Sequence, residues 1–524
     1  MYTNAWVADL MLDLVGYTDD QDLAADTIVE PGCGDGAFLR RIIPRLMRSV
    51  ERQGHDVRTL RGAIEAYELD PASVSSARAR VVEILSEHGL TGSDARDLAN
   101  RWVIQGDFLL RPTYRSVRWV VGNPPYVRVE DSSPDTYAEY RGRWKTMSGR
   151  ADVYIGFYEA GLSMLRSGGQ LCFICADRWM HNQYGAGLRR HIVENFALSA
   201  LIEVHDADVF DVPVTAYPAI TLVERSAHSA TALATASAMF EEGGAARLSQ
   251  WISSVERDPV SDPQFSASVL EGKFGAEGSW PSGPPERLRM IADLEDRYPS
   301  LTEVGVSIGV GMATGADKVY VVGTPVDVER RFLKKAIGPA DLQNGSIVWQ
   351  GRYIVSPWDG EQLADRPAFP KLKAYFELHA ERLKARYVGV KFPQSWWRTI
   401  DRPQGERFDS PKLIVADIND RIEPVLDREG YWPLHSAYFI TSSEWDLEVL
   451  GGYLLSETAG AFVEAYSVKM ANGHLRVSAQ YLKRIRLPVY GDVPVEVRSA
   501  LAEAFRHRDR DLASSAVSSL LSPR

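Results

Sequence analysis

The sequence predicts an α/β fold, with an open and mostly parallel sheet in its first part and a mixed α+β domain in its second. Short apolar strands alternate with amphipathic helices between residues 26 and 225. Alternation of this kind is typical of a parallel sheet with helices on both faces. The 524 residues exceed what one core ordinarily contains, so we expect two or three domains.

The strands and helices of the first part can be placed from their apolar spacing. Strands are expected at "DTIVEPG", "LRGAIEAYELD", "RWVIQGDFL", "RWVVGNPPY", "QLCFICA", "LSALIEVH" and "YPAITLVER". Helices are expected at "AFLRRIIPRLMRSV", from Pro71 to Glu87, at "DVYIGFYEAGLSMLRSGG" and at "YGAGLRRHIVENF". Gly168 and Gly169 would close the third of these helices, because glycine is common just past a helix C-terminus.

The composition changes near Ser226, where Ala, Ser, Gly and Pro become frequent in "SAHSATALATASAMFEEGGAA" and "GAEGSWPSGPPE". Such stretches are typical of linkers. We therefore divide the chain into a sheet domain at 1–226, a linker or insertion at 227–298, a second folded domain at 299–490, and a C-terminal helix with a polar tail at 491–524.

The cysteine content and the absence of long apolar runs favour a cytoplasmic protein. No basic region followed by an apolar run opens the sequence, and no window approaches the roughly 18 apolar residues of a membrane span. Three cysteines in so long a chain argue against a disulfide framework. Cys172 and Cys175 form a C-x-x-C inside the apolar "LCFICA", so we expect core packing rather than a metal or redox site.

The formal net charge of −11 does not exclude a nucleic-acid partner, because a binding face is local. Each of three basic stretches is either such a face or a solvated helix surface. They are Arg141, Arg143, Lys145 and Arg150; the segment from Lys371 to Arg398, in which seven Lys or Arg residues alternate with Tyr375, Tyr387, Trp396 and Trp397; and "LKRIRLP" near the C-terminus.

A glycine-rich loop follows the first strand in "VEPGCGDGAFL". Gly32, Gly34 and Gly36 allow a tight turn and a close approach of the backbone to a ligand. The spacing G-x-G-x-G differs from the G-x-G-x-x-G of dinucleotide sites. Glu30 and Asp35 flank the loop, where a phosphate-binding loop would avoid negative charge. We therefore expect a cationic or hydroxyl-bearing ligand.

Acidic residues also follow the second and third strands, and ligands of open parallel sheets bind at the carboxyl ends of strands. Glu68 in "YELDP" can accept both hydroxyls of a ribose, whereas Asp70 before Pro71 is a good helix N-cap. Asp107 and Phe108 in "QGDFL" place an acceptor beside an aromatic ring, which suits adenine and its amino group. Acids at three successive strand ends together indicate an S-adenosylmethionine site.

Two prolines follow the fourth strand in "WVVGNPPYVRVE". Asn123 can accept a hydrogen bond through its side chain and Pro124 through its carbonyl, and the two prolines fix the direction of both acceptors. An aromatic amine is a poor nucleophile because its lone pair is delocalised into the ring. Two acceptors on its hydrogens favour the pyramidal form, in which the lone pair is free. With Tyr126 as a stacking face, Asn123 to Tyr126 predict a preorganised site for an exocyclic amine.

The order of these motifs resembles the TaqI-type, gamma-order adenine-N6 DNA methyltransferases. The resemblance covers residues 1–224 and rests on "YTNAWVADLM", "VEPGCGDGAFL", "YELDP", "GDFL", "NPPY", "ADVYIGFYEAGLSMLRSGG" and "DVFDVPVTAYPAITLVE". Further on, "GVGMATGADKVYVV", "SPKLIVADI" and "NGHLRVSAQYLKRIRLP" are similar to that family's DNA-recognition domain, more loosely. The resemblance implies a class I, Rossmann-like methyltransferase domain at 1–226 and a target-recognition domain at 299–490.

The resemblance also implies roles for single residues. Asn123, Pro124, Pro125 and Tyr126 would hold an adenine flipped out of the duplex. Phe210 in "DVFDVP" would pack against the flipped base, with Tyr217 as the second candidate. This chain has Asn4 after Thr3, where the family usually has proline. The cofactor site would be lined by Thr3, Glu30, Glu68, Asp107 and Phe157.

The implied cofactor is S-adenosylmethionine and the implied partner is double-stranded DNA, in a bacterial or archaeal restriction–modification or phage-defence system. A separately encoded restriction endonuclease or defence-system subunits would be further partners, and we expect no membrane partner and no metal. No Asp…Glu-x-Lys nuclease constellation is evident, so a fused endonuclease is not expected. Two alternatives stay open: methylation of another planar amine or amide (rRNA guanine-N2, cytosine-N4 or protein glutamine), and DNA recognition without catalysis.

Overall fold

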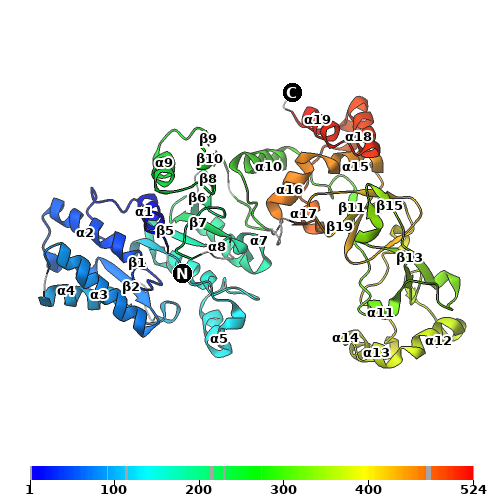
Figure 1. The fold of residues 1–524 in the computed structure, drawn as a ribbon, viewed down its shortest axis with the longest axis horizontal. Helices are drawn as coiled ribbons and strands as arrows, with labels where there is room; N and C mark the ends of the chain where they lie inside the picture. Colours follow the sequence, from blue (N-terminus) through cyan, green and yellow to red (C-terminus); the bar gives the residue numbers. More distant parts are fainter. Residues whose placement is uncertain are drawn as a thin grey trace. The chain divides into compact units, whose positions relative to one another are not determined.

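The structure is a computed structural model that describes residues 3–90, 92–111, 116–212, 217–227, 230–272, 274–467 and 474–522. The chain divides into two compact units, Met1–Arg289 and Met290–Arg524 (Figure 1). The first unit contains a ten-stranded sheet, and the second contains smaller sheets and most of the C-terminal helices.

The sheet of the first unit has the strand order β3-β2-β1-β4-β5-β7-β6-β8-β10-β9. The five neighbouring strands β3, β2, β1, β4 and β5 are parallel to one another. β7 lies between β5 and β6 and is antiparallel to both. This doubly wound order confirms the expected α/β fold. The strands are β1 (Ile28–Glu30), β2 (Ile64–Glu68), β3 (Val103–Gln105), β4 (Val117–Gly122), β5 (Leu165–Ala176), β6 (Ala197–Glu203), β7 (Pro218–Glu224), β8 (Thr231–Ala236), β9 (Val260–Ser261) and β10 (Phe265–Leu270).

Helices cover both faces of this sheet. Successive side chains of a strand point to opposite faces, so neighbouring residues of β4 contact different helices. Trp119 in β4 faces α1 (Ala5–Leu14), and its indole nitrogen donates to Val15 O just beyond that helix over 2.9 Å. Val120, the next residue, faces α6 (Tyr154–Met164), where a Cβ added to Gly161 would lie 3.2 Å from its side chain. The unit also contains α2 (Leu39–Gln53), α3 (Pro71–Glu87), α4 (Gly92–Trp102), α5 (Pro134–Arg143), α7 (Arg178–His181), α8 (Ala186–Asn195) and α9 (Glu242–Ser253).

α6 ends earlier than the sequence predicts. It stops at Met164, and β5 starts directly after it. Gly168 and Gly169, expected as the helix cap, instead lie within β5, where the register against β4 shifts. A Cβ at Gly169 would lie 3.0 Å from Val117 O, so this close strand contact requires glycine.

The segment at 227–298, expected to be a linker or an insertion, is not a linker. Within its described residues, β8 and β10 extend the large sheet, with β8 parallel to β6 and antiparallel to β10. Its alanines suit this position, because Ala232, Ala234 and Ala236 are buried in the core. The boundary between the units accordingly falls at Arg289, inside α10 (Pro285–Arg297), rather than at residue 226.

The second unit is a mixed α+β body. One four-stranded sheet has the order β11-β23-β19-β21 and is antiparallel throughout, and another has the order β12-β16-β13-β22. Their strands are β11 (Val306–Val310), β12 (Val321–Val322), β13 (Leu333–Ile337), β16 (Tyr353–Val355), β19 (Lys412–Ala416), β21 (Val425–Asp427), β22 (Trp432–Pro433) and β23 (Ala437–Ser442). The helices include α11 (Asp317–Tyr320), α12 (Pro370–Leu378), α13 (Ala380–Lys384), α14 (Tyr387–Lys391), α15 (Leu447–Leu455), α16 (Glu457–Tyr466) and α17 (Ala479–Leu482).

Two helices, α18 (Val495–His507) and α19 (Arg510–Leu521), occupy the C-terminal segment, where the sequence predicts one helix and a polar tail. The expected tail is wrong because α19 buries an apolar side that includes Val517 and Leu521. α18 packs closely on α15. A Cβ added to Gly452 of α15 would lie 2.0 Å from Leu501 O of α18, so the contact depends on glycine.

We expect Gly452→Ala to lower the free energy of unfolding by about 2 kcal/mol or more, because the added methyl group would overlap the backbone of α18. Gly460→Ala in α16 is the matched control, since nothing lies within 4 Å of its Cβ position. That change should be neutral or should stabilise by about 0.5–1 kcal/mol through helix propensity. Denaturant unfolding of the three proteins measures both effects, and equal stability of Gly452→Ala and wild type would contradict the tight helix contact.

Candidate active site

Polar residues from four strands meet at the carboxyl edge of the large sheet. Glu30 ends β1, Glu68 ends β2, Asp107 follows β3 and Asn123 follows β4. β1 lies between β2 and β4 and is parallel to both, so three of these strand ends are direct neighbours. In open parallel sheets, this edge is where ligands bind.

The glycine loop after β1 is tied to the end of β2. Gly34 N donates to Glu68 Oε2 over 2.9 Å, and Glu68 Oε1 accepts the next two backbone amides of its own strand end over 2.8 and 2.9 Å. Gly34 and Gly36 have φ values of 54° and 94°, a region that favours glycine. Glu68 therefore sets the shape of the loop.

Glu30 is buried beside this loop, with 2% of its surface exposed. Its Oε2 has no hydrogen-bond partner among the described residues. Burial, followed by repulsion from Glu68 and Asp35, raises the pKa of Glu30 well above its usual value. Asp35 itself has Arg80 beside it, with Nη2 3.4 Å from its carboxylate. A buried carboxyl oxygen without a partner is costly, so a cationic or hydrogen-bonding ligand would be favourable here.

The elbow at residues 123–126 lies against the glycine loop. A Cβ placed on Gly32 would be 3.8 Å from Pro125 Cδ, and one placed on Gly122 would be 3.4 Å from Pro31 Cδ. Pro124 is buried and Pro125 is exposed. The loop after β1 and the elbow after β4 therefore form one continuous surface.

Asn123 presents an acceptor without a protein partner. Its Nδ2 donates to Thr3 Oγ1 over 3.3 Å, whereas its Oδ1 is buried and accepts no hydrogen bond from the described residues. Thr3 is buried and pairs with Phe210 in an antiparallel bridge. The amide is thus held by its nitrogen, which leaves its oxygen available to a ligand.

Aromatic rings flank the elbow. Tyr126 and Phe210 have ring centroids 6.5 Å apart with their planes at 80°, and Tyr154 lies 6.4 Å from Tyr126. Phe210 is 4% exposed. Tyr217, the second candidate for this position, contacts the ring of His205.

The end of β3 is closed by protein contacts. Asp107 Oδ1 accepts the Leu109 amide over 2.8 Å, and its Oδ2 accepts the Tyr140 hydroxyl over 2.6 Å. Phe108 and Phe157 stack with ring centroids 5.4 Å apart and are 2% and 7% exposed. Both oxygens of Asp107 already have partners, and both rings belong to the wall of the site rather than to its open surface.

An apolar side chain that the sequence reasoning missed lies between the two acids of "YELDP". Leu69 is 63% exposed, directly after Glu68. Its signal in the sequence was an apolar residue at a strand end, between two polar ones. Asp70 is confirmed as a helix cap, because its carboxylate accepts the Ser73 amide over 2.8 Å at the start of α3.

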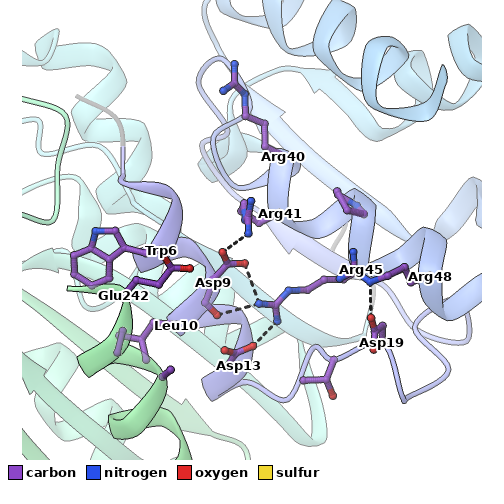
Figure 2. Close-up of a pocket in the computed structure, with 14 residues that line it drawn as sticks. Trp6, Asp9, Leu10, Asp13, Asp19, Arg40, Arg41, Arg45, Arg48 and Glu242 are labelled. Atoms are coloured by element: carbon purple, nitrogen blue, oxygen red, sulfur yellow. Dashed lines mark hydrogen bonds and ion pairs between the residues drawn. The ribbon is translucent and has the colours of Figure 1, made fainter. Parts of the chain in front are cut away.

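A separate groove of about 450 Å³ lies between α1, α2 and α9 (Figure 2). Most of its cationic wall is already paired: Arg41 and Arg45 contact Asp9, and Arg48 contacts Asp19. None of its lining residues comes from the four strand ends. We therefore assign the site to the carboxyl edge and not to this groove.

The aromatic residues of the second basic stretch are largely structural. Trp396 is 6% exposed and belongs to an apolar core, against which Tyr375 and Trp397 pack. Arg386 donates to four backbone carbonyls of the same unit. These side chains are therefore not free for a partner, because they build the core of the second unit. The exposed members around α14 are Arg382, Lys384, Tyr387 and Lys391.

The first basic stretch lies on and after α5, next to the site. Tyr140 of α5 is the residue that bonds Asp107, and Arg141 and Lys145 are exposed. Arg143 donates to the Arg111 carbonyl. In "LKRIRLP", the apolar positions are buried in the second unit. Cys172 and Cys175 are buried in β5, which confirms their expected role in the core.

Comparison with known proteins identifies restriction-modification enzymes as similar to this chain. The Eco57I restriction-modification methylase family matches residues 117–210, a span that holds both the elbow and Phe210. The solved structure of the Type IIL restriction-modification enzyme MmeI in complex with DNA is similar in fold, with a TM-score of 0.55 and 13% identity over 99% of this chain and 74% of that chain. Among the described residues, no helix combines the length and the apolar character needed to cross a membrane.

Full-length relatives are Type II methyltransferases. M.XhoI from Xanthomonas vasicola is 38% identical over 98% of this chain and 95% of its own length. M.PaeR7I from Pseudomonas aeruginosa is also 38% identical, over 99% and 90%, and M.BstVI from Geobacillus stearothermophilus is 34% identical, over 93% and 89%. The similarity thus extends through both units. This chain belongs to the Type II methyltransferase family, and its first unit has the class I methyltransferase fold.

Proposed function

We propose that this protein transfers a methyl group from S-adenosylmethionine to N6 of an adenine flipped out of duplex DNA, as part of a restriction–modification system. The observation that carries the proposal is the buried Asn123 Oδ1, an acceptor with no partner among the described residues, in a rigid elbow against the glycine loop. A buried acceptor of this kind favours a ligand that donates a hydrogen bond, such as an exocyclic amino group. The structural similarity to MmeI, which was solved with DNA, supports DNA as the substrate.

The carboxyl edge fits S-adenosylmethionine, whose sulfonium supplies an electrophilic methyl group when bound. Glu30 offers a buried carboxyl group that lacks a partner on one oxygen, which suits a cationic group. Glu68 lies where ribose-binding carboxylates lie in such folds, and Leu69 adds exposed apolar surface for a base. The rest of the cofactor site would be lined by Thr3, Gly32, Gly34, Asp35, Gly36, Asp107, Phe108 and Phe157.

The elbow would hold the target base. Asn123 and Pro124 would accept hydrogen bonds from the two hydrogens of the amino group, and Pro125 would keep both acceptors in place. Tyr126 would stack on the base, and Phe210 would cover it from another side. The rings of Tyr126 and Phe210 now meet edge to face, so a base that enters would part them. Flipping costs a few kcal/mol, which contacts elsewhere in the complex must supply.

Labelling with tritiated S-adenosylmethionine tests this proposal. The purified protein is incubated with mixed-sequence duplex DNA, and methylated bases are identified and mapped by sequencing. Label at N6 of adenine supports the proposal, and label at N4 of cytosine would assign a different target base to the same elbow. Absence of label from the DNA would overturn DNA methylation.

We expect Asn123→Ala to lower the methylation rate by roughly 10²–10³-fold, the usual effect of removing one preorganised hydrogen-bonding group. Cofactor affinity should stay unchanged, because Asn123 contacts the base. Single-turnover methylation and calorimetric titration with S-adenosylmethionine measure the two quantities. Asn195→Ala is the control, because Asn195 ends α8 and its side-chain amide donates to His191 O of the same helix. Loss of cofactor binding in Asn123→Ala would contradict the assigned role.

We expect cofactor binding to strengthen as the pH rises. Burial raises the pKa of Glu30, so the ligand-free protein keeps this group protonated where an exposed glutamate is ionised. A cationic ligand favours the ionised form, so binding should release a proton, and affinity should fall as the pH drops through the raised pKa. The folding stability of the ligand-free protein should depend on pH in the opposite direction. The contribution of Glu30 to stability is lost as the pH rises through its raised pKa, because the buried group must then ionise.

Calorimetry in two buffers of different ionisation enthalpy measures this proton release. Glu30→Gln should bind more weakly, without proton release and with little dependence on pH. If the variant kept the wild-type pH profile, the proton would belong to another group.

We expect charge removal around α14 to weaken DNA binding in a salt-dependent way. Arg382→Gln and Lys391→Gln should each reduce the slope of log K against log salt by about 1 if the residue contacts a phosphate. Arg506→Gln in α18, also exposed, is the control and should leave the slope unchanged. Fluorescence anisotropy at several salt concentrations measures the slopes. Equal slopes in all four proteins would place the DNA-binding face elsewhere.

A further inference from the structure

A second cluster of buried ionisable side chains lies at the ends of β5 and β6. Asp177 follows β5, and Glu203 ends β6. His205 Nε2 lies 3.0 Å from Asp177 Oδ2, a close polar contact without hydrogen-bond geometry, and His181 Nε2 lies 3.8 Å from the same oxygen. All four side chains are less than one-tenth exposed. The proposed chemistry uses none of them.

Asp177 makes a second contact, through its backbone. Its amide donates to Tyr217 O over 2.9 Å, just before β7 begins. The Tyr217 ring in turn meets the His205 ring with centroids 5.2 Å apart and planes at 64°. Asp177, directly after β5, thus contacts both His205 and Tyr217, which lie on either side of Phe210 in the sequence.

His205 is the second residue of the segment that carries Phe210, defined here as residues 204–212. Val204 N donates to Pro218 O over 3.1 Å at the base of this segment. At its other end, Val209 O accepts the Asn4 amide over 3.0 Å, and Phe210 pairs with Thr3. The segment is therefore held near the elbow by Thr3 and Asn4, and near β5 by the contact of His205 with Asp177.

We propose that Asp177 is a positioning residue for the target base. Asp177 acts through His205, and so sets the path of the segment that places Phe210 against Tyr126. This inference rests on the proposed function, because it assigns the segment to the pocket of the flipped base. Asp177 touches neither base nor cofactor in this assignment. It orients the wall against which the base packs.

The electrostatics of the cluster support a persistent contact. Burial raises the pKa of Asp177, but the neighbouring His181 and His205 outweigh burial and bring the pKa to about 2. Asp177 therefore stays ionised throughout the pH range of ordinary assays. Glu203 Oε2 lies 4.0 Å from His205 Nδ1, so the ring has a carboxylate on each side. Glu203 Oε1 accepts the Gly283 amide over 2.7 Å, which holds that carboxylate in place.

The test measures flipping and methylation separately. Asp177→Asn keeps the size of the side chain and removes its charge. We expect a methylation rate about tenfold to a hundredfold lower, because small misplacements of positioning groups have effects of this size. Cofactor affinity should be unchanged. Fluorescence of 2-aminopurine at the mapped target position should report less flipped base than with wild-type protein.

Two further measurements distinguish positioning from loss of stability. A mismatch opposite the target base lowers the cost of flipping, so it should restore much of the lost rate in Asp177→Asn. A double-mutant cycle should show that Asp177→Asn with His205→Gln costs no more than either change alone, whereas Asp177→Asn with His181→Gln should be closer to additive. Asp26→Asn removes an exposed ion pair with Arg166 at the start of β5 and should leave flipping unchanged.

The possible results separate the two hypotheses. If wild-type protein methylates no DNA, the proposed function fails, and this inference fails with it. If wild-type protein methylates DNA and Asp177→Asn matches it in rate and flipping, only the positioning role is overturned. A rate loss that the mismatch does not relieve, or a cycle with full additivity for His205, would also overturn it. Should Asp177→Asn fold poorly, His205→Gln provides the same flipping and mismatch readouts.

Discussion

The parallel pairing of β1 with β2 and β4 is the constraint on which the site depends. It brings the ends of three strands to one edge, and with them Glu30, Glu68 and Asn123. Apolar packing on both faces of β4 sets its register, with Trp119 toward α1 and Val120 toward α6. A slip by one residue would exchange these faces and turn Asn123 away. The position of the elbow is therefore a consequence of core packing.

Two buried polar sites, one in each unit, differ in whether their charged or polar atoms have partners. In the second unit, Lys412 and Asp427 are fully buried, with Nζ 2.6 Å from the carboxylate, and Asp427 also accepts three backbone amides. This pair is complete, so it requires no ligand. At the carboxyl edge, Glu30 and Asn123 each bury an oxygen that has no partner among the described residues. Such a deficit costs stability, and a ligand that donates hydrogen bonds or positive charge would offset it.

Much of the first unit could be predicted where local signals agree with the fold. α3 runs from Pro71 to Glu87 as expected, because Asp70 caps it and proline suits its first position. β8 was missed because its alanines lack the bulky apolar side chains that mark a strand, although a crowded interior favours small residues. The early end of α6 was missed because the double glycine that resembles a helix cap serves a strand register shift instead. In each case a tertiary contact overrides the local pattern.

Some features of the candidate site could likewise be predicted from the sequence, and others could not. Glu30, Glu68 and Asn123 could be predicted to meet, since strand ends converge whatever the details of packing. The contacts of Asn123 with Thr3 and of Asp177 with His205 could not, because they join residues far apart in the sequence and leave no periodic signal. The basic stretch of the second unit shows the converse. Trp396 and Tyr387 are both aromatic residues among basic ones, yet Trp396 is buried and Tyr387 is 75% exposed. Composition can locate a basic and aromatic segment, but only packing decides which of its side chains face a partner.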